Sequence, residues 1–340
     1  MMKRRRIMAM VLALVMVASM FALAACNSGG SSSTADTGSS AAAVDEGSSA
    51  AETGTSAGAG MKIGVTYYSL QNEFTVRMDN AGQAYCDEND ITLVSYDGNY
   101  DAATQLAQTE TMIAEGCDAI IIDPVDAEAC AASVEAAYNA GIPCIGANAM
   151  VNSDVLTSYI GSQDVLAGQD IMQYMIDYLG RDDFNIVIIE GPMGQSAQLQ
   201  RLEGIENILK DHPDITILAK QTANWSRSEA MTIMESWLKS YDNIDAVMGE
   251  NDEMALGARE AIKAAGKDIP CIGVDGITDA VTAIQNGDMI ASDFQNAEAQ
   301  MIKAIEVAVA AANGEEVEDF YWIPFEMITP ENVEDYVNKY

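Results

Sequence analysis

Polar side chains follow several apolar runs of this chain, and their types suit the recognition of hydroxyl groups. Asn148 and Asp275 each follow an apolar run, two residues after its glycine, and Asp123 follows another such run. Ligands of open parallel sheets bind beyond the carboxyl ends of the strands, so these groups are expected in one cleft. A polar residue after a strand is also a common turn former or helix cap. Several of them converging on one cleft favour contact with a ligand.

The chemistry that these residue types suit is the binding of a neutral, hydroxyl-rich ring. Sugar hydroxyls donate and accept, and a sugar also carries a patch of C–H groups, so its site needs amides, carboxylates, a guanidinium and aromatic faces. Trp225 lies in a polar stretch without a helical apolar stripe, whereas Trp237 and Trp322 fit packing positions. The candidate contacts are Asn72, Phe74, Asp123, Asn148, Arg201, Trp225, Asn251, Asp275 and Gln295.

Short apolar runs that alternate with longer helical segments must position these residues. The runs are apolar on both faces, as are strands of a parallel sheet that helices cover. The alternation predicts a doubly wound α/β fold, and about 280 residues from Met61 onward favour two lobes. The predicted strands are Ile63–Tyr67, Ile91–Ser95, Ala119–Ile122, Ile142–Ala147, Ile186–Ile189, Ile215–Ala219, Ala246–Met248 and Ile269–Val274, and the predicted helices include Gln105–Glu115, Ala127–Ala140, Ser226–Ser240 and Ala255–Ala265.

An internal repeat supports the two lobes. Asp118-Ala119 is followed 24 residues later by Ile142-Pro143-Cys144-Ile145-Gly146. Asp245-Ala246 is followed by Ile269-Pro270-Cys271-Ile272-Gly273 at the same separation. Two matched elements at matched spacing indicate two copies of one half-domain.

The N-terminal residues predict export and a lipid anchor. Four basic residues, Lys3 to Arg6, precede an apolar run of about signal-peptide length, and Leu23-Ala24-Ala25-Cys26 follows it. The last four residues resemble a bacterial lipobox, in which acylated Cys26 becomes the new N-terminus. Residues 1–25 are therefore predicted to be a lipoprotein signal peptide, and residues 26–60, rich in Ser, Gly, Ala and Thr, a flexible tether. This arrangement predicts a protein held at the extracellular face of the cell membrane in a Gram-positive-type envelope.

Charge and cysteine content exclude several other classes. The formal net charge of −35 offers no electrostatic footprint for nucleic acid. Five cysteines remain beyond Cys26, and this odd number without paired spacing argues against a disulfide framework, so we expect small buried side chains. With His212 as the single histidine, we predict no metal site and no cofactor.

Three motifs resemble those of the periplasmic galactose/glucose- and ribose-binding proteins, which have the type I solute-binding fold. They are Asn251-Asp252-Glu253-Met254-Ala255-Leu256-Gly257-Ala258, Gly273-Val274-Asp275-Gly276 and Ile122-Asp123-Pro124, and the resemblance covers residues 61 to 340. It places the candidate residues above on ligand-contact positions and adds Gln195. Two positions depart from the family, since Ala149 replaces a basic side chain and Ala197 a carboxylate. The calcium-binding loop of some hexose receptors is not evident.

The resemblance also implies an architecture and partners. Two Rossmann-like lobes, 61–162 with 296–325 and 163–295 with 326–340, are expected to be joined by a three-strand hinge. They are expected to close on a monosaccharide, first a hexose such as galactose or glucose and next a pentose. The crossings are expected near Gly161–Ser162, Gln295 and Phe325–Glu326. The expected partners are the permease subunits of an ABC importer, and the protein is expected to be a monomer.

Other readings share parts of this pattern. A sugar-sensing receptor for chemotaxis or a two-component system would use the same fold, and polyols or furanosyl signalling molecules present similar hydroxyls. A transcriptional repressor core does not fit the export signal and the acidic charge. An enzyme is disfavoured, because no G-x-G-x-x-G follows the first strand and no nucleophile elbow or histidine base is present. We therefore predict no catalytic residue.

Overall fold

The computed structural model describes residues 57–337 and residue 339. The predicted signal peptide, Cys26 and most of the predicted tether lie outside these residues. In the described part of the chain, no helix combines the length and the apolar character needed to cross a membrane.

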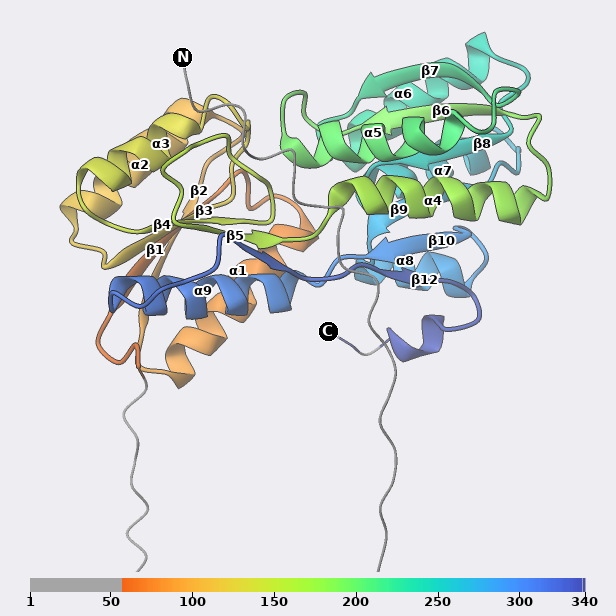
Figure 1. The fold of residues 1–340 in the computed structure, drawn as a ribbon. Coiled ribbons are helices and arrows are strands. Elements are labelled where there is room, and N and C mark those ends of the chain that lie inside the picture. Colours follow the sequence, from red (N-terminus) through yellow and green to blue (C-terminus); the bar gives the residue numbers. More distant parts are fainter. Residues whose placement is uncertain (1–56, 338, 340) are drawn as a thin grey trace, which may run out of the picture. The chain divides into compact units, whose positions relative to one another are not determined.

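Two six-stranded sheets organise the described residues (Figure 1). The first has the order β11-β5-β4-β3-β1-β2, and all its neighbours are parallel. The second has the order β12-β10-β9-β8-β6-β7, in which β12 alone is antiparallel to its neighbour. The strands are β1 (Lys62–Tyr67), β2 (Thr92–Asp97), β3 (Ala119–Ile122), β4 (Cys144–Ala147), β5 (Ser158–Gly161), β6 (Asn185–Glu190), β7 (Thr216–Thr222), β8 (Ala246–Gly249), β9 (Cys271–Asp275), β10 (Ala291–Phe294), β11 (Phe320–Trp322) and β12 (Glu326–Ile328).

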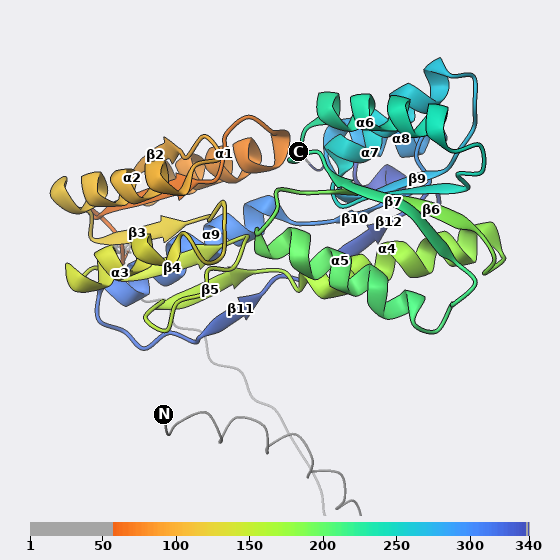
Figure 2. The ribbon, with the colours of Figure 1, turned by 90° about the horizontal axis from the view of Figure 1, so that it is seen from above.

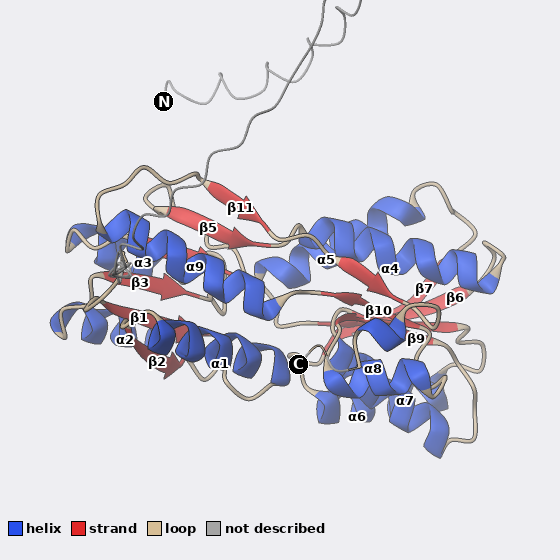
Figure 3. Ribbon diagram, turned by 90° about the horizontal axis from the view of Figure 1, so that it is seen from below, coloured by secondary structure: helices blue, strands red, loops and turns tan. Residues whose placement is uncertain are grey.

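The same strand order occurs twice, which confirms the α/β class and the internal repeat. In each sheet the chain leaves the first strand to one side and returns to the other side for the third strand, as in doubly wound folds. Strands β3, β4, β8 and β9 are buried throughout, because helices cover both faces of each sheet (Figure 3). The polar residues that follow these strands therefore lie at the carboxyl edges, where doubly wound folds bind ligands.

The helices begin at side-chain caps in several cases. Asn72, Asp101, Ser226 and Asn251 each accept a hydrogen bond from a backbone N–H of the first turn. The helices are α1 (Glu73–Glu88), α2 (Ala102–Ala114), α3 (Ala131–Asn139), α4 (Asp164–Leu179), α5 (Ser196–Leu209), α6 (Arg227–Ser240), α7 (Asp252–Ala264), α8 (Thr278–Gln285) and α9 (Ala297–Ala312), with a short 3₁₀ turn at Val333–Asp335.

Several element boundaries and one packing prediction differ from the sequence analysis. The predicted helix Ala127–Ala140 begins at Ala131, because the Asp126 carboxylate accepts from the backbone N–H groups of Glu128 and Ala129 and forms a separate turn. The predicted strand Ile269–Val274 begins at Cys271. Trp322 is not a packed residue, since it is 44% exposed and stacks flat on Phe320 at the edge strand β11. The five cysteines beyond Cys26 are free and buried, as predicted.

The chain passes between the two sheets three times. It leaves β5 of the first sheet for α4, which packs on β8, β9 and β10 of the second. It returns from β10 to α9, which packs beside α1. The last crossing joins β11 to β12 (Figure 2).

Glycine lets two helix pairs approach closely, α4 with α5 and α6 with α7 (Figure 2). A Cβ atom added at Gly168 of α4 would lie 2.0 Å from the carbonyl oxygen of Arg201 in α5. A Cβ atom added at Gly257 of α7 would lie 2.1 Å from the carbonyl oxygen of Arg227 in α6. Because backbone atoms cannot move aside cheaply, a larger residue at Gly168 must push α5 away from α4.

Gly168→Ala should therefore lower the free energy of unfolding by about 2 kcal/mol, since overpacking outweighs the gain in helix propensity. Urea unfolding followed by circular dichroism measures this change. Gln173→Ala, at an exposed position of the same helix, is the matched control and should change stability little. Equal midpoints for the two variants would refute the close helix contact.

Candidate functional site

A buried arginine connects the polar groups at the carboxyl edges of the strands. Arg201, on α5, is 3% exposed. Its Nε donates to Asp164 Oδ1 at 2.9 Å, its Nη1 to the carbonyl oxygen of Glu250, and its Nη2 to Gln295 Oε1 at 2.8 Å. Asp275 Oδ1 lies 3.9 Å from Nη1. The guanidinium thus positions groups from α4, from the ends of β8 and β9 and from the loop after β10.

Opposite charges compensate the buried charge of this arginine. Burial alone lowers the pKa of Arg201, but the carboxylates of Asp164 and Asp275 outweigh it, so the pKa is raised. Burial raises the pKa of both carboxyl groups, and Arg201 opposes that rise. Removing one partner of such a buried pair is costly, because the other charge is then left without compensation.

A small cavity, which we call the inner cavity, lies against this arginine. It measures about 20 Å³, space for about one water molecule, so a hexose-sized ring enters only when its walls move apart. Every predicted contact lines it except Asn72 and Asp123. The lining residues are Tyr68, Phe74, Asn148, Gln195, Ala197, Arg201, Trp225, Asn251, Asp275 and Gln295.

The two exceptions lie next to the inner cavity rather than in its wall. Asp123 is fully buried and accepts from Asn148 Nδ2, at 3.2 Å to Oδ1 and 3.3 Å to Oδ2. Burial raises its pKa well above the usual range. Asn72 caps α1 by accepting from the N–H of Thr75, and its amide donates to Tyr68 Oη at 2.8 Å. Both residues thus hold side chains that do line the cavity.

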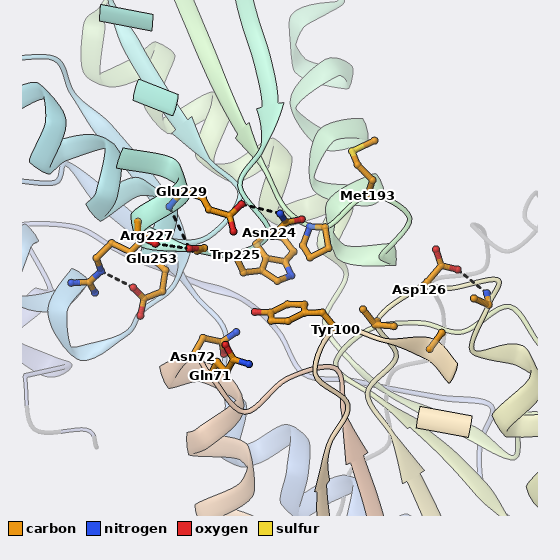
Figure 4. A pocket seen from close by; sticks show the side chains of 16 residues that line it. Gln71, Asn72, Tyr100, Asp126, Met193, Asn224, Trp225, Arg227, Glu229 and Glu253 are labelled. Carbon is orange, nitrogen blue, oxygen red and sulfur yellow. Dashed lines mark hydrogen bonds and ion pairs between the residues drawn. The ribbon is translucent and has the colours of Figure 1, made fainter. Parts of the chain in front are cut away.

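Asn72 belongs instead to the wall of a larger space, which we call the outer cavity (Figure 4). This cavity measures about 1040 Å³ and is lined from both sheets. Gln71, Asn72, Tyr100 and Asp126 come from the side of the first sheet, and Met193 with residues 224–229 and Glu253 comes from the side of the second. Trp225 lines both cavities.

Asn148 is held in a left-handed conformation by its neighbours. Its φ angle is 61°, and asparagine tolerates this region better than most residues. The hydroxyl of Tyr159 donates to its carbonyl oxygen, and Gln295 Nε2 donates to its Oδ1 at 3.1 Å. Together with the bonds to Asp123, these contacts fix the amide at the cavity wall.

Trp225 forms an aromatic wall of the inner cavity, and its position depends on Gly191 and Gln195. Its indole Nε1 donates to Gln195 Oε1, and Gln195 Nε2 donates in turn to the carbonyl oxygen of Pro124 at 3.1 Å. A Cβ atom at Gly191 would lie 2.2 Å from the indole, so a larger residue there would displace the ring. The Arg201 guanidinium lies 5.6 Å from the centre of the ring, within the range of a cation–π contact.

Two polar groups of the inner cavity keep capacity for a ligand. Within residues 57–337, the Asp275 carboxylate accepts no hydrogen bond, and Asn251 uses only its Oδ1, which accepts from the N–H of Met254. Asp275 can therefore accept from hydroxyl groups, and the Asn251 amide can donate to them. Phe74 and Trp225 add apolar faces, which completes a surface suited to a hydroxylated ring.

The sequence analysis missed Tyr68 and Asp164. Tyr68 comes directly after the first predicted strand, which was a signal for it, although a tyrosine there fits packing equally well. Asp164 opens α4 after a strand that was not predicted, and only the fold brings it to Arg201. Ala197 was noted as a departure from the family, and it does line the cavity.

Comparison with known proteins assigns the family. Residues 63–316 match the family model described as a periplasmic binding protein domain. This chain belongs to the periplasmic binding protein family.

Relatives and solved structures of the family extend over most of the chain. A xylitol-binding protein of Mycolicibacterium smegmatis is 38% identical over 82% of this chain and 82% of its own length. A ribose import binding protein of Bacillus subtilis is 30% identical over 78% of this chain and 87% of its own length. The crystal structure of an ABC transporter solute binding protein from Bacillus halodurans with bound myo-inositol is 38% identical, has a TM-score of 0.79, and covers 83% of this chain and 99% of that one.

A buried carboxyl group next to the site makes the stability of this periplasmic binding protein depend on pH. Asp252 accepts from the N–H groups of Gly276 and Ile277 and from the Ser292 hydroxyl, but burial still raises its pKa to about 7. Between pH 4 and 7 the folded state thus holds a proton that the unfolded state has lost. This contribution to stability is present below pH 4 and is lost as pH rises through 7.

The free energy of unfolding should therefore fall by about 3 kcal/mol between pH 5 and pH 8 through Asp252 alone. Asp252→Asn should remove this part of the fall, because the amide oxygen can accept the same N–H bonds while its NH₂ donates to Ser292. Urea unfolding at both pH values tests it, with the exposed Asp87→Asn as control. An unchanged pH dependence in Asp252→Asn would contradict the assignment.

Proposed function

We propose that this periplasmic binding protein captures a neutral polyhydroxy compound, a polyol or a monosaccharide, for an ABC importer. The observation that carries the proposal is the inner cavity, where Arg201 and Asp275 meet an open amide at Asn251 and the aromatic faces of Phe74 and Trp225. Charged hydrogen bonds to hydroxyls supply specificity, and the aromatic faces bury the C–H patch of the ring. The relatives named above support this ligand class.

Within that class we place polyols, cyclitols included, ahead of hexoses and pentoses. A xylitol-binding protein and a structure with bound myo-inositol are each 38% identical to this chain. Ala149 and Ala197 also lack the charged side chains that the galactose/glucose and ribose receptors were expected to have at these positions. A site with fewer charged side chains forms fewer charged hydrogen bonds to hydroxyl groups, and we infer that its ligand is a polyol rather than a hexose or pentose.

We propose further that two lobes close on the ligand, 61–162 with 296–325 and 163–295 with 326–340. Contacts between residues of the two lobes support this. Gln195 bonds to Pro124, and the N–H of Met150 donates to Ser196 Oγ at 2.6 Å. Elsewhere, Glu73 Oε1 accepts from the N–H of Thr278 at 3.0 Å. A ligand that contacts both lobes would favour this closed form over an open one.

A thermal-shift screen of the purified chain against polyols, cyclitols, hexoses and pentoses should identify the ligand. A ligand at about 100 times its dissociation constant adds about 2.7 kcal/mol to stability. The ligand should be recovered unchanged after long incubation, because we propose binding without catalysis. A shift with no polyhydroxy compound would refute the proposed function.

Asp275→Ala should weaken binding of that ligand by about 3 kcal/mol, more than a hundredfold in the dissociation constant. The loss is large because Asp275 is the acceptor that the cavity leaves open and also a partner of Arg201. Isothermal titration calorimetry measures it, with Glu260→Ala on the exposed side of α7 as the control. Undiminished affinity in Asp275→Ala would show that the ligand binds elsewhere.

We also propose that acylated Cys26 anchors the protein to the extracellular face of the membrane, as the lipobox pattern predicts. Cells fed a labelled fatty acid should incorporate label into the chain, and Cys26→Ala should abolish it. Labelling that persists in Cys26→Ala would contradict the anchor.

A further inference from the structure

The outer cavity adjoins the proposed binding site without being part of it. Trp225 lines both cavities, and Tyr100 of the outer cavity lies 5.6 Å, between ring centres, from Tyr68 of the inner one. The side chain of Asn72, in the outer wall, donates to Tyr68 Oη. At about 1040 Å³, the outer cavity has room for more than one hydroxylated ring.

Two equivalent loops place the aromatic side chains of this cavity. Asn99 and Tyr100, after β2, have φ angles of 51° and 57°, and Asn224 and Trp225, after β7, have φ angles of 52° and 60°. Each pair comes directly before the capping residue of the next helix. Bulky residues rarely adopt this left-handed conformation, and such outliers concentrate at ligand sites. Here the same unusual loop occurs once in each half of the repeat.

Figure 4 shows Tyr100 and Trp225 on facing walls of the outer cavity. Aromatic rings presented from two walls suit the C–H faces of a hydroxylated ring. Trp225 also lines the inner cavity, so a ligand that lies along its indole can extend from the inner cavity into the outer cavity.

The charges of the outer cavity indicate which chemical groups of a ligand it can bind. Asp126, Glu229 and Glu253 are acidic, whereas Arg227 already pairs with Glu253 at 2.6 Å and with Asp279 at 2.8 Å. The surplus of carboxylates repels phosphate and sulfate groups and can accept hydrogen bonds from hydroxyls.

We propose that the outer cavity is a second subsite, which takes a neutral hydroxylated ring joined by a glycosidic bond to the ring in the inner cavity. The ligand class is then a glycoside of a polyol or a sugar. This proposal rests on the proposed function, because the inner ring must bind where that function places it.

Calorimetry on the purified full chain with three matched pairs tests the subsite. The pairs are myo-inositol with its galactoside galactinol, galactose with melibiose, and xylose with xylobiose. For the ring that binds best, the glycoside should bind about tenfold tighter than the free ring. Tyr100→Leu should remove that gain while the affinity for the free ring stays within about twofold. Tyr138→Leu, at a tyrosine that is 60% exposed on α3, is the control and should change neither affinity.

The outcomes separate the two proposals. If free rings bind but no glycoside binds tighter, or if Tyr100→Leu weakens both members of a pair equally, the outer subsite is refuted and the proposed function stands. If none of these rings or glycosides binds, the outer subsite is refuted, and the proposed function fails as well when the thermal-shift screen finds no polyhydroxy ligand.

Discussion

The ionised, buried guanidinium of Arg201 is the group on which the arrangement of the site depends. Asp164, Asp275 and the carbonyl oxygen of Glu250 face it from three different elements and compensate its buried charge. Desolvating a charge is expensive, so the surrounding residues are held to positions that satisfy it. Its third bond, to Gln295, continues to Asn148 and so joins the carboxyl edge of the second sheet to that of the first.

Close backbone packing allows that arginine to reach its partners. Gly168 brings α4 against α5 at the backbone of Arg201 itself, which sets the distance between Asp164 and the guanidinium. Gly257 has the same role between α7 and α6, next to the loop that carries Trp225. The glycines thus act on the site through helix spacing, without contributing a side chain to the cavity.

The internal repeat explains why equivalent strands of the two sheets supply residues to the site. Strands β4 and β9 are equivalent in the two sheets, and they lead to Asn148 and Asp275, both with positive φ angles. Strands β2 and β7 are equivalent too, and they lead to Tyr100 and Trp225. The members of each pair differ in chemistry, amide against carboxylate and phenol against indole. Tyr100 and Trp225 have nearly the same φ angle, 57° and 60°, whereas those of Asn148 and Asp275 are 61° and 123°.

Local residue patterns predicted the fold class and the internal repeat and, together with the family resemblance, most residues that line the inner cavity. Apolar runs that end in polar residues are local signals. Because ligands bind at the carboxyl edges of such sheets, these signals predicted a site that includes Asn148, Asn251 and Asp275. The strands that local patterns did not predict are β5, β10, β11 and β12. The equally short β3, β4 and β8 are uninterrupted apolar runs, whereas β5, β10 and β12 each include a polar residue and β11 has only three residues, so none of the four stands out as an apolar run.

Which polar residues face the inner cavity and which lie behind its wall depends on tertiary packing. Asp123 and Asn72 have the same residue types and the same positions after strands or before helices as true wall residues, but hydrogen bonds to Asn148 and Tyr68 turn them to supporting positions. Asp164 is recognised as part of the site only from its hydrogen bond with Arg201, 37 residues away in the chain. Such contacts depend on how elements far apart in sequence pack together, and no local pattern of residues encodes that packing.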